Sequence, residues 1–372
     1  VFTGADIKDH VKPMPQPVVQ PNLPARYPTF WPLAVDKVKH HGEPVALVVA
    51  RDKYVAVDAA EAVVVEYEEL TPVLDPEAAL APGAPIVHEA DGTNEIFAMT
   101  LTGGDTPEAQ AENARAVEAI FQGADVVVKE RFRVHRTGIT PIEPRAVLCD
   151  WSDADGLTAW ITTQRPHIDR LALIDILDIP GEQVRVIAPR DQGGAFGVKT
   201  NFYPEELALA AIATRVDYPV RWIESRSEFM LAACQAREQV QTITVHARRD
   251  GTLVALEADV IGDGGAYSMI TSTGAVEANM AVSVMPGPYR IEHYRMRARS
   301  ACTNKAPMSA QRGVGRPGAV FAMERTIDEL AGVLGLAPNE VRRRNVLVPA
   351  EFPYRTATGL VYDSGRFEHV MD

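Results

Sequence analysis

The sequence predicts an α+β fold, because segments typical of strands and of helices are mingled along the chain without strict alternation. Short runs rich in β-branched residues, such as residues 126–132 and 240–246, have the composition of strands. Longer stretches that open with proline, such as residues 166–177 and 204–215, have the composition of helices. The chain contains no internal repeat that would indicate a solenoid.

The first part of the chain, residues 1–82, predicts a small α/β unit. Residues 43–50 and 63–67 are rich in apolar and β-branched side chains, so both are predicted strands. Asp52 is the predicted N-cap of a helix that runs to Ala62, because its carboxylate can accept hydrogen bonds from free backbone amides.

A larger domain is predicted over residues 126–372, after a connecting arm at residues 83–125. The arm begins with turn sequences and contains a short predicted helix at residues 108–121. Gly335 is expected to end a long helix in the left-handed conformation. The other predicted elements of the larger domain are strands at residues 157–163, 184–187 and 253–260 and helices at residues 319–334 and 338–345.

The composition argues against several classes of protein. A formal net charge of -13 at pH 7 argues against a nucleic-acid surface, which needs a basic footprint. The three cysteines, Cys149, Cys234 and Cys302, are far apart, so they form neither a disulfide framework nor a cysteine-based metal motif. This usage is typical of a reducing cytoplasm. No stretch approaches the ~18 consecutive apolar residues of a membrane span.

A glycine-rich stretch at residues 191–199, Asp-Gln-Gly-Gly-Ala-Phe-Gly-Val-Lys, is the most unusual local sequence. Its glycines let the backbone approach another group closely, and the ring of Phe196 is expected to anchor the loop in a core. Successive free amides in such a loop favour an anion. The spacing fits neither a dinucleotide fingerprint nor a phosphate-binding P-loop. An ordinary tight turn explains it equally well.

A second stretch places Arg312 and Arg316 on either side of Gly-Val-Gly, just before a predicted helix. The positive end of the helix dipole and two guanidinium groups would suit an anionic cofactor. The commoner alternative is that both arginines pair with local carboxylates such as Glu324 or Glu329.

Two single polar residues also stand out. Gln164 follows a predicted strand, where its amide can donate and accept hydrogen bonds, or can simply cap the next helix. Glu143 lies between two prolines, which would hold it stiffly, and it could merely pair with Arg145. The histidines do not have the spacing of metal ligands.

Taken in order, these stretches resemble the large subunit of the molybdenum hydroxylases, the family of xanthine dehydrogenase, aldehyde oxidase and aerobic carbon monoxide dehydrogenase. The order is a Thr-Gln-x-Pro strand end, then Gly-Gly-Ala-Phe-Gly-x-Lys, and then Gln-Arg-Gly-x-Gly-Arg-Pro before a helix. The resemblance spans nearly the whole chain. It implies an α/β hammerhead domain at residues 1–82, truncated at its N-terminus, followed by the first molybdopterin-binding domain.

The resemblance also implies roles for the matching residues. Gln164 matches the glutamine that hydrogen-bonds an oxygen on molybdenum, and Arg312 matches the arginine beside the metal. Phe196 matches the residue whose backbone meets the cofactor, so the two turns are expected to converge on one pterin-bound metal. The other expected cofactor-binding residues are Gly193, Gly194, Ala195, Gly197 and Gly313.

The residues expected to line the substrate pocket, Thr200, Met280 and Val314, depart from the purine-oxidising members of the family. Those members place a glutamate, an arginine and a stacking phenylalanine at or near these positions. Xanthine is therefore not the expected substrate, and an aldehyde, an N-heterocycle or a similar small molecule is. Copper-bearing carbon monoxide dehydrogenases have a cysteine where this chain has Gly313, so no molybdenum–copper site is expected.

Large subunits of this family extend beyond both ends of this chain, and their later domain carries the glutamate that acts as general base. We therefore expect no catalytic base within these residues. The implied cofactor is molybdopterin in its cytosine dinucleotide form with molybdenum. Iron–sulfur clusters on a small subunit and FAD on a medium subunit would complete a cytoplasmic dimer of heterotrimers. The alternatives are a non-catalytic assembly paralogue, a carbon monoxide dehydrogenase-like enzyme without the copper-binding cysteine, and a nucleotide-binding module.

Overall fold

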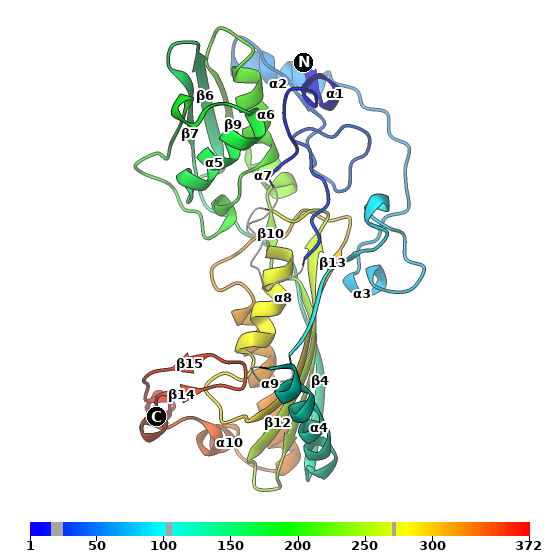
Figure 1. Ribbon diagram of the computed structural model, residues 1–372, viewed down its shortest axis with the longest axis vertical. Coiled ribbons are helices and arrows are strands. Elements are labelled where there is room, and N and C mark those ends of the chain that lie inside the picture. The colour runs from blue at the N-terminus through cyan, green and yellow to red at the C-terminus, as the bar shows by residue number, and fades with distance from the viewer. Residues whose placement is uncertain (16–24, 102–105, 270–272) are drawn as a thin grey trace.

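The computed structural model describes residues 1–15, 25–101, 106–269 and 273–372. Three ranges lie outside the described residues: 16–24, 102–105 and 270–272. One falls in each of the predicted segments 1–82, 83–125 and 126–372. The molecule is elongated, with a smaller sheet near the N-terminus and a long twisted sheet that extends away from it (Figure 1). Strands and helices are mixed as predicted, so the α+β class is confirmed. None of the described helices has the length and apolarity to cross a membrane.

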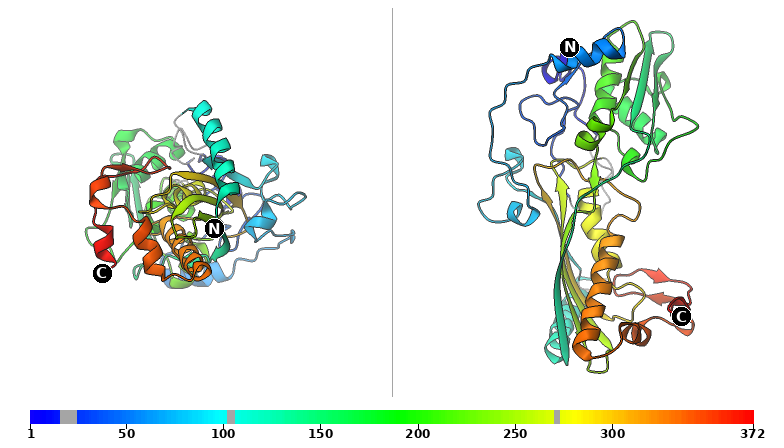
Figure 2. Two further views of the ribbon diagram at one scale, coloured as in Figure 1. Left: turned by 90° about the horizontal axis from the view of Figure 1, so that it is seen from below. Right: turned by 180° about the vertical axis from the view of Figure 1, so that it is seen from behind.

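The larger sheet has five strands, of which β12 and β13 are parallel and the other neighbours antiparallel. Helices α8 (Thr273–Val284) and α9 (Arg316–Leu334) pack on one face, and α4 (Pro107–Gly123) packs on the other (Figure 2). The strand order is β3 (Glu95–Leu101), β13 (His293–Cys302), β12 (Leu253–Gly265), β11 (Gln239–Ala247) and β4 (Val126–Val134). The expected connecting arm, residues 83–125, thus supplies an edge strand and a covering helix to this sheet.

The core of this half lies between the larger sheet and helices α8 and α9. The first part of strand β13 alternates, with Tyr294, Met296 and Ala298 buried and arginines between them. Burying such apolar side chains contributes roughly 25 cal/mol per Å². The alternation therefore fixes which face of β13 meets the helices, since a slip of one residue would bury the arginines.

The smaller sheet has four strands in the order β8 (Val184–Ile187), β7 (Gly156–Ile161), β6 (Ala146–Ser152) and β9 (Val220–Ile223). Helices α5 (Pro166–Leu177) and α6 (Pro204–Ala213) pack against it, and nearly every residue of α6 is buried. A further helix, α7 (Arg226–Ala232), leads to a two-stranded ladder at the junction between the two sheets, formed by β5 (Thr137–Gly138) and β10 (Gln235–Ala236).

The N-terminal segment departs from its prediction in two places. The predicted strand at residues 43–50 shrinks to β2 (Ala46–Leu47), which pairs with β1 (Phe2–Thr3). The predicted strand at residues 63–67 is wrong, because no described strand pairs with it and Val64 is 87% exposed. Strand composition alone does not form a strand without a partner edge. The other elements here are α1 (Gly4–Ile7), α2 (Lys53–Glu61) and α3 (Pro76–Ala79).

Helix caps account for the best-predicted boundaries. The Asp52 carboxylate accepts from the backbone amides of Tyr54 and Val55, as predicted. Gly335 ends α9 with φ 68, the left-handed conformation expected of it. The predicted helix at residues 338–345 is confirmed as α10 (Pro338–Asn345). The chain then forms β14 (Tyr354–Arg355), β15 (Val361–Tyr362) and α11 (Phe367–Val370).

A buried ion cluster ties the smaller sheet to α6. Arg145 has no exposed surface and donates to Glu224 (Nε–Oε2, 3.0 Å) and to both carboxylate oxygens of Glu205. Its guanidinium also stacks 3.7 Å from the centre of the Tyr203 ring. The guanidinium is therefore neutralised on two sides and packed on a third.

Replacing Arg145 by methionine should lower the free energy of unfolding by about 3–5 kcal/mol, because the buried Glu224 carboxylate would lose its cation. The exposed Arg221 on β9 offers a matched control. Arg221→Met should change the free energy of unfolding by less than about 0.5 kcal/mol. Urea unfolding followed by tryptophan fluorescence measures both, and equal effects of the two substitutions would contradict the role given to the cluster.

Candidate active site

Two loops that are far apart in sequence meet between the smaller sheet and the start of α9. The first, residues 191–197, follows β8, and the second, residues 310–315, precedes α9. The Phe196 carbonyl oxygen accepts a hydrogen bond from the Arg312 backbone amide at 2.9 Å. Gly197 lies so close to the second loop that a Cβ on it would stand 1.8 Å from the Ala310 carbonyl oxygen. The glycine–phenylalanine turn and the arginine turn therefore converge, as expected.

The backbone of the first loop has an unusual conformation. Gly194 (φ 99), Phe196 (φ 54) and Gly197 (φ 115) all have positive φ, which glycine adopts readily and other residues rarely. No described residue accepts a hydrogen bond from the amides of Gly194, Ala195 or Phe196. The expectation that the Phe196 ring anchors the loop in a core is wrong, because this residue is 49% exposed. The ring instead packs over Gly194 at the edge of the loop.

Glu143 lies just before β6 and anchors the first loop. Its Oε2 accepts from the Gly193 amide (2.5 Å) and from the Lys199 ammonium (3.0 Å), and its own amide donates to the Gly193 carbonyl. The alternative that Glu143 pairs with Arg145 is wrong, because Arg145 is bound to Glu224 and Glu205. The prolines around Glu143 were the sequence signal for this anchoring role.

Gln164 joins the strand end of β7 to the same loop. Its Oε1 accepts from the Gly197 amide at 3.1 Å, and its own amide donates to the Lys199 carbonyl. Its Nε2 has no acceptor among the described residues. Gln164 is therefore more than a helix cap. It offers the two N–H groups of its Nε2 as free donors beside the free amides of the loop.

Arg312 in the second loop and Arg316 at the start of α9 are exposed and make no ion pair within the described part of the chain. Glu324, a suggested partner, is bound by Arg342, and Glu329 is bound by Arg325. The alternative of local pairing is therefore wrong for both Arg312 and Arg316. Two guanidinium groups four residues apart remain available to an anion.

The expected substrate-pocket residues lie around the same two loops. The Thr200 hydroxyl donates to the Gly197 carbonyl at 2.5 Å, which caps the first loop. Val314 stands in the second loop with φ 51. Met280 lies on α8, where its Sδ is 2.8 Å from an Arg316 guanidinium nitrogen. Gly315 brings this helix and the loop together, since a Cβ there would stand 2.3 Å from a carbonyl oxygen of α8.

Comparison with known families agrees with this geometry. The family description "Molybdopterin cofactor-binding domain" matches residues 88–346. The description "Aldehyde oxidase and xanthine dehydrogenase, a/b hammerhead domain" matches residues 1–71. The chain belongs to the molybdenum hydroxylase family. Its matched residues are those of the molybdopterin-binding large subunit of that family.

Individual molybdenum hydroxylases match over 91% or more of the chain. The nicotine 6-hydroxylase large subunit of Paenarthrobacter nicotinovorans is 35% identical over 100% of this chain and 44% of its own length. The carbon monoxide dehydrogenase large chain of Hydrogenophaga pseudoflava is 32% identical over 91% of this chain and 43% of its own. The crystal structure of quinoline 2-oxidoreductase from Pseudomonas putida 86 has a TM-score of 0.89, at 32% identity, and covers 100% of this chain and 45% of that one. The chain thus spans less than half the length of these relatives.

The residues present fit a molybdopterin group. The loop amides, the Gln164 Nε2 and the Arg312 guanidinium are all hydrogen-bond donors without a protein acceptor among the described residues. Such a set suits the phosphate and oxygen atoms of the cofactor. The described residues contain no group of three or more histidine, cysteine and acidic side chains that could hold a metal ion.

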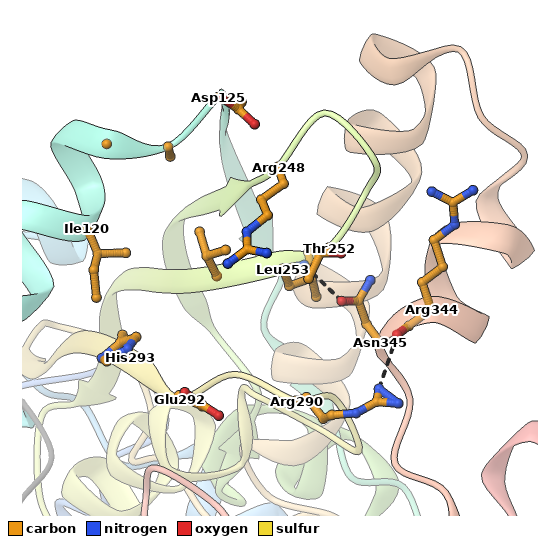
Figure 3. A pocket seen from close by; sticks show the side chains of 13 residues that line it. Ile120, Asp125, Arg248, Thr252, Leu253, Arg290, Glu292, His293, Arg344 and Asn345 are labelled. Atoms are coloured by element: carbon orange, nitrogen blue, oxygen red, sulfur yellow. Dashed lines mark hydrogen bonds between the residues drawn. The ribbon is translucent and has the colours of Figure 1, made fainter.

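A pocket of about 720 Å³, drawn in Figure 3, lies where β12 and β13 begin, at the end of the larger sheet away from the two loops. It is bounded by the turn between β11 and β12, the end of α4 and the end of α10. Arg248 points into it, and Asn345 closes one wall by accepting from the Leu253 amide. None of the predicted site residues lines this pocket. It is therefore separate from the two converging loops.

The contact between the loops predicts a steep cost for any side chain at position 197. Gly197→Ala should lower the free energy of unfolding by more than about 2 kcal/mol, because the left-handed conformation and the clash with the Ala310 carbonyl both penalise a Cβ. A Cβ on Gly332, within α9, would meet no atom within 4 Å. Gly332→Ala should therefore stabilise the chain by roughly 0.5–1 kcal/mol.

Thermal unfolding measures both substitutions. Hydrogen exchange at the Arg312 amide gives a local readout, because the bond to Phe196 protects it. An unchanged exchange rate in Gly197→Ala would contradict the coupling of the two loops.

Proposed function

We propose that this chain is the cofactor-holding part of an oxidoreductase that hydroxylates a small substrate with oxygen derived from water. The observation that carries this proposal is the convergence of free donors from three segments, namely Gln164, the amides of residues 194–196 and Arg312. Such a group of free donors stabilises an oxygen-rich anionic group and negative charge that develops on it. When bound, the molybdenum group supplies Lewis acidity and accepts the two electrons of the oxidation.

Each residue has a distinct task in this proposal. The amides of residues 194–196 and the Arg312 guanidinium bind the polar edge of the cofactor. Gly193 and Gly197 keep the backbone close to it, and Gly313 does the same in the second loop. Gln164 donates from Nε2 while its Oε1 stays on the Gly197 amide, so its orientation is fixed before anything binds.

The residues on the substrate side favour a compact molecule of low polarity. Met280 and Val314 are apolar, and the Thr200 hydroxyl already donates its hydrogen bond to the Gly197 carbonyl. We propose an N-heterocycle or an aldehyde as the substrate. The names of two relatives, a nicotine hydroxylase and a quinoline oxidoreductase, support the heterocycle. Gly313 offers no thiol for a copper ion.

The remaining parts of the proposed enzyme lie outside these residues. The cofactor would carry molybdopterin in its cytosine dinucleotide form, and the general-base glutamate would come from a later domain. Cys149, Cys234 and Cys302 are all buried and unpaired, so they are unsuited to hold iron–sulfur clusters. Electrons would therefore leave through a small iron–sulfur subunit and a medium FAD subunit. We propose a dimer of heterotrimers in the cytoplasm.

Metal analysis of the full-length protein, purified with its neighbouring subunits, tests the function directly. We expect about one molybdenum atom and one pterin dinucleotide per large subunit, as a domain of this family would bind. A folded complex without molybdenum, from cells that load other molybdenum enzymes, would overturn the proposal. It would leave a non-catalytic assembly subunit, or a nucleotide-binding module if nucleotide alone were bound.

Gln164→Glu tests the proposed donor. The substitution keeps an acceptor for the Gly197 amide, replaces the Nε2 donor by an oxygen and adds a negative charge, so the loop should stay in place while the donor is lost. We expect kcat to fall by a factor on the order of 10², as when a single donor to a developing charge is lost. The melting temperature should change little. Gln122→Glu on α4 is the control and should leave kcat unchanged. Full activity of Gln164→Glu would refute the role of the donor.

A further inference from the structure

We propose that Arg237 is a positioning residue of this site, which clamps the second loop in its bound shape without touching the cofactor. The inference rests on the proposed function for its catalytic consequence. Its structural part stands on the loop alone. Arg237 lies between β10 and β11, and sequence analysis gave it no role.

The Arg237 guanidinium spans the whole second loop. Its Nη2 donates to the Arg312 carbonyl (2.7 Å), and its Nη1 donates to the Val314 carbonyl (3.1 Å). Its Nε donates to the Gln311 Oε1 (2.8 Å). Arginine alone among side chains offers several donors in one rigid plane, so it can hold three points of a turn at once. No carboxylate among the described residues forms an ion pair with it.

Backbone strain gathers around this clamp. The described residues include four non-glycine residues with positive φ, namely Asp178, Phe196, Arg237 and Val314. Asp178 simply ends α5. The other three belong to the two loops or hold them, and the β-branched Val314 is especially unsuited to φ 51. Such conformations persist only where neighbours enforce them, and they cluster at functional sites.

The backbone of Arg237 is itself held from the other side. The next residue, Glu238, accepts from Arg136 (2.8 Å) and from Lys305 (2.8 Å) within a largely buried ion cluster. Lys305 also binds Asp263, at the end of β12. The left-handed turn at Arg237 (φ 73) separates the two side chains, so that one enters the cluster and the other reaches the loop. The clamp is therefore built on a rigid base.

Loss of the clamp should release the loop while the fold stays intact. The carbonyls of Arg312 and Val314 would lose their donors, and Val314 would relax from its left-handed conformation. The bond between the Arg312 amide and the Phe196 carbonyl would then weaken, since both loops share it. The Arg312 guanidinium would no longer be held at the cofactor.

The test uses Arg237→Gln and Arg237→Lys in the full-length protein with its partner subunits. Arg295→Gln is the matched control. Arg295 on β13 binds Glu257 on β12 and Glu118 on α4, away from both loops. We expect hydrogen exchange of the amides of residues 311–316 to rise roughly tenfold to a hundredfold in both Arg237 variants. The control should leave these amides unchanged.

Arg237→Lys separates a clamp from a simple charge. Lysine keeps the charge but cannot span three acceptors, so it should lower molybdenum content and kcat nearly as much as glutamine does, with a smaller change in KM. Adding Val314→Gly to Arg237→Gln should recover part of the loss, since glycine removes the strain that the clamp resists. A variant destabilised only in general would gain nothing from this second change.

The two proposals fail in different ways. Unchanged exchange of residues 311–316 in Arg237→Gln, or wild-type kcat in Arg237→Lys, would overturn the clamp whatever the metal content. A wild-type complex without molybdenum would overturn the function, while the exchange experiment would still measure the clamp.

Discussion

The site depends on the contact between Gly197 and the Ala310 carbonyl, where two loops from separate parts of the chain touch without room for a Cβ. Other interactions preserve this contact. The Phe196 carbonyl binds the Arg312 amide beside it, and the Ser309 hydroxyl lies 3.4 Å from the Gly197 carbonyl. The smaller sheet supports one loop, and the long helix α9 supports the other. The shape of the site therefore depends on how these two parts of the molecule are placed relative to each other.

Charge is distributed so that the site keeps unpaired cations in an acidic chain. With a net charge of -13, carboxylates are plentiful, and several arginines are bound by them, as Arg145 and Arg342 are. Arg312 and Arg316 have no such partner among the described residues, and Arg237 donates to two backbone carbonyls and to the Gln311 side chain. The loops thus present fixed positive charge and free amides before a ligand arrives. Such preorganisation avoids the reorganisation that water would require.

Sequence patterns predicted the elements that depend on residues within the element itself. They missed those that depend on contacts with distant segments of the chain. Proline at the first turn marked α5, and β-branched residues marked β8, so both were confirmed. The run at residues 63–67 failed because strand formation needs a partner edge. Strand β13 was missed although its buried residues alternate with arginines, because the charged residues masked the pattern. The convergence of the loops followed from family resemblance. Nothing in the sequence around Arg237 distinguishes it. Its proposed role comes only from its hydrogen bonds to the second loop.

The division of chemistry within the proposed enzyme follows from which groups remain free. The Glu143 carboxylate already accepts from the Gly193 amide and the Lys199 ammonium, so it is engaged in holding the first loop. Glu277 lies under the second loop and burial raises its pKa to about 7, but its side chain is fully covered and Gly315 packs on its backbone. Asp191, at the start of the first loop, is an exposed carboxylate, but the free groups of residues 194–196, Gln164 and Arg312 are all donors. Such an arrangement suits the binding and orientation of an anionic cofactor, and in the proposed enzyme the general base would come from another domain.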